Sequence, residues 1–162
     1  MKKVEAMFYI LLFFLIVVLD RVTKFFALSL LQEYTVNNYL SLWLTFNPGI
    51  NFGLLRTNNY FGLLLLNTII GSVLLIFFFF VLYKSERDPL SLIPNILILA
   101  GGISNYFDRF YYNGVIDFIV FSAKGWSWPA FNIADVAIVT GIFFMLLFYK
   151  NKNYYRNAAP TI

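Results

Sequence analysis

Two aspartates draw attention because each lies in an apolar stretch with no basic residue at adjacent or helical spacing. Asp117 interrupts the apolar residues 114–120, and Asp135 follows residues 131–134. Two carboxyl groups that meet in a poorly solvated place cannot both ionise cheaply, so one retains a proton while the other can act as a base. Hydrolysis by an activated water needs such a pair. Spacing alone also allows two separate aspartates, solvated or capping a helix.

The composition removes most other catalytic chemistries. The sequence has no histidine and no cysteine, which excludes His-based triads, thiolate nucleophiles, disulfides and HExxH zinc sites. Of its 162 residues, 60% are hydrophobic and 12% are charged, whereas about 25% are charged in ordinary soluble domains. We therefore expect lipid to cover much of the surface, the alternative being a soluble helical bundle with an unusually apolar core.

Apolar runs predict four membrane-spanning helices within one integral-membrane domain of residues 1–162. The predicted spans are about residues 7–31, 61–83, 90–107 and 133–149. A cleaved signal peptide is the alternative for the first run, but Asp20, Arg21 and Lys24 stand where a small-residue cleavage site should lie. The predicted fold class is an all-α membrane protein with a small extracytoplasmic β-sheet.

Basic residues predict the orientation of these spans. Seven of the twelve Lys and Arg residues flank span ends that share one face, and the positive-inside rule makes that face cytoplasmic. They are Lys2, Lys3, Lys84, Arg87, Lys150, Lys152 and Arg156. Both termini are then cytoplasmic, and the connections 32–60 and 108–132 are extracytoplasmic. The net charge of +4 lacks a basic run with interleaved aromatics, so no nucleic-acid partner is expected.

The first connection predicts a small sheet. Apolar and polar residues alternate over residues 40–47, a period typical of a strand with one covered face. Asn47-Pro48-Gly49 predicts a turn, and residues 50–55 are expected to form a second strand that pairs back onto the first. This sheet would rest on the outer leaflet, on the same side as most of the acidic residues.

Other acidic residues have predicted partners. Asp20 and Lys24 are four residues apart and share one helix face, so they are expected to neutralise each other, while Arg21 lies on a different face. Asp108 is followed by Arg109, and an ion pair between them is expected to anchor the end of the third span. Asp117 and Asp135 have no such partner.

A helix-capping argument divides the roles of the two aspartates. Asn132 is expected to cap the fourth helix, which places Asp135 at the third helical position, where free backbone N–H groups favour an anion. We expect Asp135 to be ionised and to accept the water proton. Asp117, in its apolar stretch, is expected to hold a proton and to polarise the scissile carbonyl.

Five sequence blocks, in this order, carry a resemblance to a known family. They are residues 20–24 (DRVTK), 47–53 (NPGINFG), 101–109 (GGISNYFDR), 114–118 (GVIDF) and 131–135 (FNIAD). Together they resemble the bacterial lipoprotein signal peptidases, or signal peptidase II, along nearly the whole chain.

The resemblance implies a fold and an activity. It implies four transmembrane helices and a sheet that cradles the substrate, with Asp117 and Asp135 as an aspartic dyad at the extracytoplasmic face of the bacterial cytoplasmic (inner) membrane. The implied reaction is removal of the signal peptide from diacylglyceryl-modified prolipoproteins, by cleavage before the lipidated cysteine. The resemblance also implies that membrane lipid surrounds the enzyme, that globomycin-type antibiotics inhibit it, and that it needs no metal or cofactor. The supporting positions that it implies are Asp20, Lys24, Asn47, Gly49, Asn105, Asp108, Arg109, Asn132 and Ala134.

This chain departs from the family pattern at three positions. Ile50 and Asn51 stand where the family usually has two alanines, and Ser104 stands where it usually has glycine. Bulkier side chains narrow close-packed space, so these changes bear on the substrate groove and on inhibitor sensitivity.

Two alternative functions stay open. A Ser/Lys peptidase would pair a serine with Lys24 or Lys124. A small ion-coupled membrane transporter component would use Asp20, Asp108, Asp117 and Asp135 along an ion path, but these carboxylates gather at one face instead of at mid-depth in the bilayer.

Overall fold

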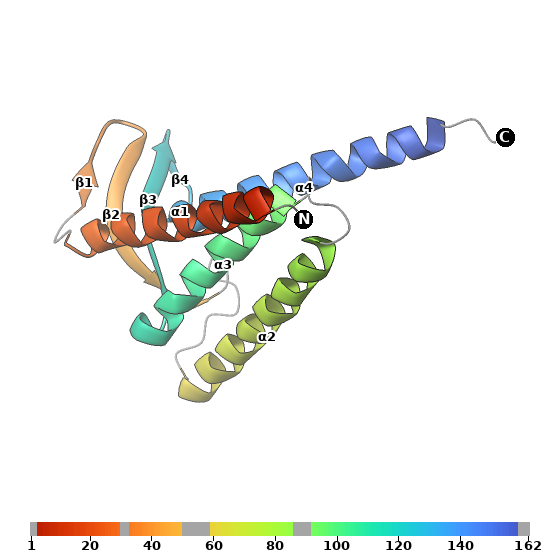
Figure 1. Cartoon of the computed structure of the whole chain (residues 1–162). Helices are drawn as coiled ribbons and strands as arrows, with labels where there is room; N and C mark the ends of the chain where they lie inside the picture. The colour runs from red at the N-terminus through yellow and green to blue at the C-terminus, as the bar shows by residue number, and fades with distance from the viewer. Residues whose placement is uncertain (1–2, 30–32, 50–58, 86–91, 159–162) are drawn as a thin grey trace.

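In the part of the chain that the structure describes, four long helices hold most residues, and a small antiparallel sheet lies at one end of them (Figure 1). The structure, a computed structural model, describes residues 3–29, 33–49, 59–85 and 92–158. The helices are α1 (Lys3–Leu28), α2 (Tyr60–Ser85), α3 (Leu92–Tyr112) and α4 (Ile133–Ala158). The prediction of a mostly helical chain with a small sheet is confirmed.

Two of these helices are long and apolar enough to cross a membrane. They are α1, over Lys3–Leu28, and α2, over Tyr60–Lys84, while α4 contains a shorter apolar segment, Ile133–Phe148. In α2, large apolar side chains such as Ile76 and Phe79 are exposed, as expected of a helix surrounded by lipid. The count of four spans remains a prediction.

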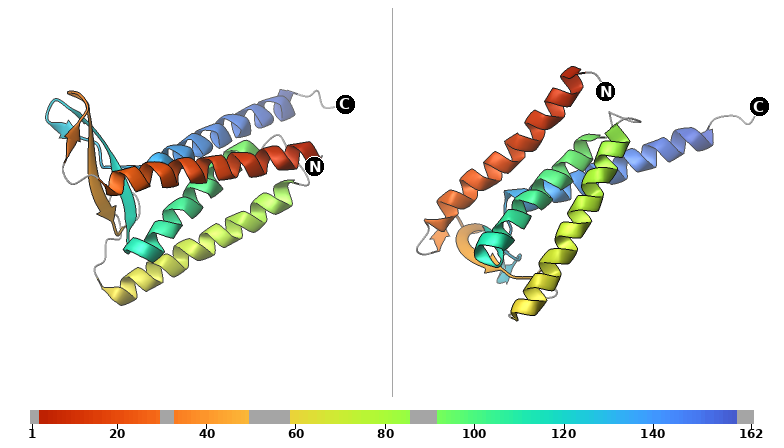
Figure 2. Two further views of the ribbon diagram at one scale, coloured as in Figure 1. Left: turned by 60° about the vertical axis from the view of Figure 1, so that its left-hand side comes forward. Right: turned by 60° about the horizontal axis from the view of Figure 1, so that its bottom comes forward.

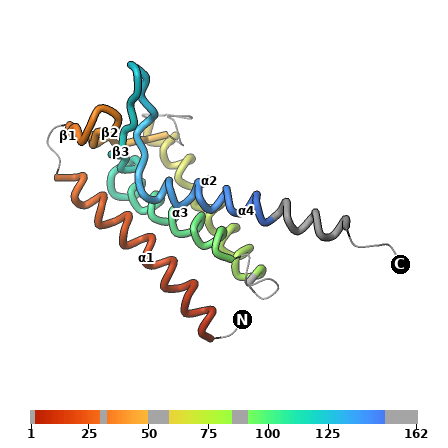
Figure 3. Tube along the Cα trace, turned by 90° about the horizontal axis from the view of Figure 1, so that it is seen from above, coloured from red at the N-terminus to blue at the C-terminus, as the bar shows by residue number. Residues whose placement is uncertain are grey.

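Helix α3 occupies the centre of the bundle and contacts each of the other three helices (Figure 3). Its paired glycines allow this close packing. A Cβ atom at Gly101 would overlap the backbone carbonyl of Ala134 on α4, and one at Gly102 would lie 2.6 Å from a methyl carbon of Leu74 on α2. Gly101 therefore lets α4 approach α3 at the residue that precedes Asp135, and Gly102 lets α2 approach α3.

The end of α3 differs from the prediction. The helix continues past residue 107 to Tyr112, so Asp108 and Arg109 lie on its last turns and not in the connection 108–132. In the sequence, Asp108 and Arg109 mark the end of the apolar run. In the fold, both side chains are buried and have polar partners, so the helix continues through them. The chain leaves α3 through Asn113, whose φ of 54° is left-handed.

The sheet has the strand order β1-β2-β3-β4, and every pair is antiparallel. The strands are β1 (Tyr34–Thr35), β2 (Leu40–Asn47), β3 (Val115–Ala123) and β4 (Trp126–Ser127). The predicted strand over residues 40–47 is confirmed as β2. The second predicted strand, residues 50–55, lies outside the described residues. Among the described strands, β2 pairs with β1 and β3.

Strand β3 has no clear signal in the sequence because its apolar residues do not alternate. Residues 115–118 are all buried, so both faces of this part of the strand are covered. Ile116 and Phe118 pack with Ala27 of α1, and Leu42 and Leu44 of β2 join this cluster. The sheet is thereby fixed at the C-terminal end of α1, and the opposite ends of α1 and α4 point away from it (Figure 2).

Candidate active site

Asp117 lies on β3 between two buried neighbours and is itself 3% exposed. Both carboxylate oxygens accept hydrogen bonds from side-chain amides. Asn132 donates to Oδ1 at 2.7 Å, and Asn47, from the end of β2, donates to Oδ2 at 3.2 Å. The β2–β3 register sets this second contact, since it pairs Thr45 with Asp117 and brings the end of β2 alongside.

Asp135 lies in the first turn of α4 and forms a reciprocal cap with Asn132. The backbone N–H of Asp135 donates to Asn132 Oδ1 at 2.9 Å, and the backbone N–H of Asn132 donates to Asp135 Oδ2 at 3.2 Å. Asn105 of α3 donates to Asp135 Oδ1 at 2.8 Å. The structure therefore has the cap that the sequence predicted, with each residue satisfying a free donor of the other.

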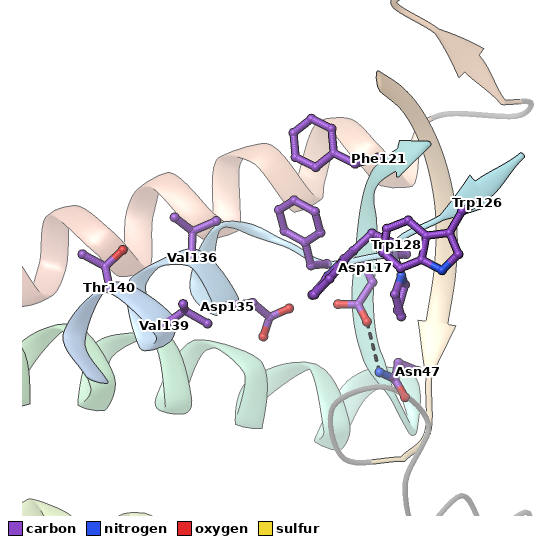
Figure 4. A pocket seen from close by; sticks show the side chains of 12 residues that line it. Asn47, Asp117, Phe121, Trp126, Trp128, Asp135, Val136, Val139 and Thr140 are labelled. Atoms are coloured by element: carbon purple, nitrogen blue, oxygen red, sulfur yellow. Dashed lines mark hydrogen bonds between the residues drawn. The ribbon is translucent and has the colours of Figure 1, made fainter. Parts of the chain in front are cut away.

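The two carboxyl groups point toward one another across the end of a pocket (Figure 4). Asn132 connects them, because its side chain donates to Asp117 while its backbone donates to Asp135. Burial, together with the nearby Asp135 carboxylate, raises the pKa of Asp117 to about 7 despite the amide hydrogen bonds from Asn47 and Asn132. A carboxyl group with this pKa can hold a proton near neutral pH and donate a hydrogen bond.

Behind the two aspartates, Lys24 of α1 connects three acceptors on two helices. Its Nζ lies 2.8 Å from Asp20 Oδ2, 2.8 Å from Asp108 Oδ2 and 2.7 Å from Asn105 Oδ1. An ammonium group has three donors, so this set satisfies it fully. The ion pair predicted between Asp20 and Lys24 is present, and both side chains are completely buried or nearly so.

Arg21 also belongs to this charged cluster, contrary to the prediction. Its Nη2 lies 3.0 Å from Asp20 Oδ2, and its Nη1 lies 2.6 Å from Asp108 Oδ1. Helical spacing alone places Arg21 on another face, but the long side chain reaches back to its neighbour and across to α3. The sequence carries no signal for the contact with α3, because the residues involved are more than 80 positions apart.

Ser104 is a further participant that the sequence did not single out for this role. It is fully buried, donates to Asp20 Oδ2 at 2.6 Å and accepts a hydrogen bond from Arg21 Nε at 3.1 Å. Asp20 then uses its other oxygen, Oδ1, to accept the backbone N–H of Ala134 at 2.9 Å. The cluster is thus bonded to the first turn of α4, one residue before Asp135.

Arg109 does not form the predicted ion pair with Asp108, whose oxygens are taken by Arg21 and Lys24. Its guanidinium donates to the backbone carbonyls of Gly49 at 2.5 Å and Pro48 at 3.4 Å. Gly49 in turn donates its N–H to Asn47 Oδ1 at 3.1 Å, which forms the predicted turn. Arg109 therefore holds the turn that presents the Asn47 amide to Asp117.

The structure brings all nine predicted supporting residues into one connected region. Asn47, Asn105 and Asn132 bond an aspartate of the pair directly. The other six bond these residues, one another or the backbone beside the two aspartates, and they are Asp20, Lys24, Gly49, Asp108, Arg109 and Ala134.

The Ser/Lys alternative finds no support in this region. Lys24 is engaged by two carboxylates and an amide, and Lys124 is exposed at the tip of the β3–β4 hairpin. Within the described ranges, no three or more Asp, Glu, His or Cys side chains are grouped so as to hold a metal ion.

Two pockets meet at the aspartates. The larger, of about 390 Å³, lies between α4 and the β3–β4 hairpin, and the smaller, of about 210 Å³, lies between α2, α3 and α4. Both are lined by Asn47, Asp117 and Asp135. A ligand in either pocket would therefore contact the two carboxyl groups.

Solved structures share this fold. A bacterial membrane enzyme aligns with a TM-score of 0.76 over 95% of this chain and 93% of that chain, at 22% identity. A second bacterial membrane enzyme aligns with a TM-score of 0.70 over 86% and 90%, at 24% identity.

Sequence comparison identifies the family. The lipoprotein signal peptidase of Polynucleobacter necessarius subsp. necessarius (strain STIR1) is 37% identical over 144 residues, which cover 87% of this chain and 88% of that protein. The lipoprotein signal peptidase of Francisella tularensis subsp. novicida (strain U112) is 30% identical over 152 residues, or 90% and 94%. The signal peptidase (SPase) II family matches residues 12–150. The chain therefore belongs to the signal peptidase II family of bacterial membrane peptidases.

Proposed function

We propose that this chain is an aspartic endopeptidase that removes the signal peptide from diacylglyceryl-modified prolipoproteins, cleaving before the lipidated cysteine. Membership in the signal peptidase II family supports the reaction and sets aside the transporter alternative. The observation that carries the catalytic assignment is the pair of facing carboxyl groups, Asp117 and Asp135, joined through Asn132 at the meeting point of two pockets.

In the first step of the proposed mechanism, ionised Asp135 removes a proton from water, and the water oxygen bonds to the scissile carbonyl carbon. Protonated Asp117 donates its proton to the carbonyl oxygen, which yields a neutral tetrahedral diol. The pKa of about 7 supports a protonated Asp117 near neutral pH. The first turn of α4, where free N–H groups stabilise an anion, supports an ionised Asp135.

In the second step, the diol collapses. Asp135 gives its proton to the nitrogen of the cysteine, the carbon–nitrogen bond breaks, and Asp117 takes a proton back from the diol as the carbonyl reforms. The products are the signal peptide with a free carboxyl group and the lipidated cysteine with a free amino group. Both aspartates return to their starting states, and no covalent enzyme intermediate forms.

The test of this assignment is cleavage of a diacylglyceryl prolipoprotein by Asp117→Asn and Asp135→Asn variants. General acid–base groups contribute about 10²–10⁴-fold, so each variant is expected to lose at least that factor in kcat. Glu33→Gln, at an exposed acidic residue, serves as the matched control and should cleave normally. Cleavage near the wild-type rate by either aspartate variant would rule out the mechanism.

The proposed topology has four spans, with both termini in the cytoplasm and the dyad at the extracytoplasmic face. It is supported by the positions of Asp117 on β3 and of Asp135 in the first turn of α4. The sheet lies at the end of the bundle opposite to the first turn of α1 and the C-terminal end of α4 (Figure 2). The chain lacks cysteine, so single-cysteine labelling is clean. In spheroplasts, an impermeant maleimide should label Lys124→Cys, and it should label Lys84→Cys only after permeabilisation.

Membrane lipid and globomycin-type inhibitors are the further partners that we propose from the family resemblance. An inhibitor of this type would act by filling the pocket space beside Asp117 and Asp135. The three departures from the family pattern bear on its affinity. Of these, Ser104 lies within the buried charged cluster, and Ile50 and Asn51 lie outside the described residues.

A further inference from the structure

Two buried carboxylates hold the backbone next to the dyad in the same way. Asp20 Oδ1 accepts the N–H of Ala134 at 2.9 Å, and Ala134 precedes one aspartate of the dyad. Asp108 Oδ2 accepts the N–H of Ile116 at 3.2 Å, and Ile116 precedes the other. All four residues are 1% exposed or less. The segments of α4 and β3 that carry the dyad are therefore each bonded to one carboxylate of the charged cluster, so the separation of these carboxylates bears on the separation of the dyad.

Arg21 bridges these two carboxylates with one rigid group. Its Nη2 lies 3.0 Å from Asp20 Oδ2, and its Nη1 lies 2.6 Å from Asp108 Oδ1. Lys24 also contacts both carboxylates, at 2.8 Å, but an ammonium group is a point charge that does not fix the direction of its partners. Among the residues that the structure describes, only Arg21 bonds Asp108 Oδ1. Without the planar guanidinium, the Asp108 carboxylate would be free to turn about Oδ2, and its bond to the Ile116 N–H would change with it.

Ser104 fixes the guanidinium itself. Its hydroxyl accepts a hydrogen bond from Arg21 Nε at 3.1 Å and donates one to Asp20 Oδ2 at 2.6 Å. Its backbone carbonyl accepts a further bond from Arg21 Nη2 at 3.1 Å. Ser104 is fully buried, and glycine, which the family usually has at this position, offers no hydroxyl. The hydroxyl contacts therefore belong to this chain, and they reach the dyad on the Asp20 side.

We propose that Arg21 and Ser104 are positioning residues for the dyad. They hold the carboxylates of Asp20 and Asp108 at a fixed separation, and through them the backbone beside the two aspartates. This assignment rests on the function proposed above. The reacting groups must keep one arrangement around the water and the scissile carbonyl, and a misplacement of about 1 Å can cost about 10²-fold in rate.

The separation of the dyad can be read from the pH dependence of kcat. The proposed mechanism uses protonated Asp117, so kcat falls as the pH rises through its pKa. The nearby Asp135 carboxylate is one cause of the raised pKa of Asp117. If the two carboxyl groups move apart, this cause weakens, the pKa of Asp117 falls, and kcat decreases at lower pH. Loss of a positive charge would shift that pKa in the opposite direction, so the variants must keep the charge. The charged groups that face Asp117 are Asp135 of α4, Lys24 of α1 and Arg109 of α3, and the variants leave all three in place.

The experiment compares Arg21→Lys and Ser104→Ala with the wild type in cleavage of a diacylglyceryl prolipoprotein over a range of pH. Both variants keep the net charge. Arg21→Lys loses the planar fork, so its single ammonium group can bond one of the two carboxylates but cannot hold both in the present geometry. Two matched controls are Lys124→Arg, the reverse exchange at an exposed position, and Ser72→Ala, at an exposed serine of α2.

We expect Arg21→Lys to lower kcat by about 10²-fold with little change in KM, because the loss falls on the arrangement of the reacting groups. Ser104→Ala should lower kcat by about threefold to tenfold. In both variants, kcat should decrease at lower pH than in the wild type. An unchanged pH dependence in both variants, or a displacement to higher pH, would overturn the proposal, and so would a near wild-type kcat in Arg21→Lys.

A second measurement does not depend on activity. Amide hydrogen exchange, followed by NMR, should become faster at both Ile116 and Ala134 in Arg21→Lys. In Ser104→Ala it should become faster at Ala134 but not at Ile116, because the serine bonds only one of the two carboxylates. The amide of Ala100, buried in α3, is the internal reference and should change less. Equal acceleration at all three amides would indicate a loss of global stability alone and would overturn the proposal, as would unchanged exchange.

Failure of the proposed function is distinguishable from these outcomes. In that case the wild-type enzyme would not cleave the prolipoprotein, or Asp117→Asn would remain active, while amide exchange would still decide whether Arg21 holds the two backbone segments. If the function holds and this inference fails, Asp117→Asn is inactive and Arg21→Lys keeps the wild-type kcat and pH dependence.

Discussion

The ammonium group of Lys24 on α1 donates a hydrogen bond to Asn105 Oδ1 on α3 at 2.7 Å, and the Asn132 amide donates to the same oxygen at 3.1 Å. These two contacts set which way the Asn105 amide points. With its oxygen toward Lys24, Asn105 presents its N–H₂ group to Asp135 Oδ1 at 2.8 Å. A buried cation thus helps to orient a neutral amide that contacts Asp135. In the proposed mechanism, Lys24 is therefore a positioning residue that acts on Asp135 through Asn105.

Replacement of Lys24 by Met should destabilise the protein. It leaves the buried Asp20 and Asp108 without the ammonium group that bonds both, and removal of one partner from a buried ion pair costs about 3–5 kcal/mol. Denaturation in detergent checks this, with Lys124→Met at an exposed lysine as the control. An unchanged denaturation midpoint for Lys24→Met would show that the cluster contributes little to stability.

Cleavage should depend on pH through Asp117. Its pKa is raised to about 7, and the proposed mechanism uses its protonated form. The protonated fraction falls as the pH rises through this value, so kcat should decrease between about pH 6 and pH 8. If kcat instead rose over this range, Asp117 would be the base and the roles of the two aspartates would be exchanged.

Asn47→Ala provides an internal check of this decrease in kcat with rising pH. The Asn47 amide donates to Asp117 at 3.2 Å and holds the pKa of that carboxyl below the value that burial alone would give. Its removal should move the decrease in kcat to higher pH. A variant that was merely misfolded would lose activity at every pH, without this displacement.

The contributions of Ser104 and Arg21 to the stability of the protein should depend on each other. Both bond Asp20 Oδ2 and each other, so Ser104→Ala leaves a buried carboxylate with one donor fewer, at a cost of about 1–3 kcal/mol. In a double-mutant cycle with Arg21→Met, the two effects should be non-additive by about 0.5–3 kcal/mol. Ser72→Ala, at an exposed serine of α2, should have little effect, and strict additivity at the Ser104–Arg21 pair would mean that the two act independently.

The paired glycines of α3 should respond differently to alanine. At Gly101 the added methyl meets the backbone carbonyl of Ala134, which cannot move without displacing the start of α4 and Asp135. At Gly102 it meets only the end of the Leu74 side chain, which can turn away. Gly101→Ala should cost about 1–3 kcal/mol in stability and also lower kcat, while Gly102→Ala should do much less. Equal effects in unfolding and cleavage assays would contradict this account.

The sequence predicted the helices more accurately than the sheet, for a physical reason. Long apolar runs identify helices by composition, and the predicted runs overlap all four observed helices. Strand β2 alternates and was predicted, whereas β3 is covered on both faces and has no alternation. The pairing of β2 with β3 joins segments about 70 residues apart, which no local pattern encodes.

In the candidate site, too, some features could be predicted from the sequence and others could not. By itself, the sequence determined which carboxyl groups lack a local partner, Asp117 and Asp135, and predicted the cap between Asn132 and Asp135, because these are properties of neighbouring residues. It could not place Arg21 and Ser104 around Asp20, since their contacts join α1 to α3.

Only the tertiary structure decided that the two aspartates face each other between an apolar and a more polar pocket. Their environment, and hence the raised pKa of Asp117, depends on burial by segments remote in the sequence. Local sequence sets the identity and helical position of a group. Packing of distant segments sets its solvation and its partners, and these determine the chemistry available to it.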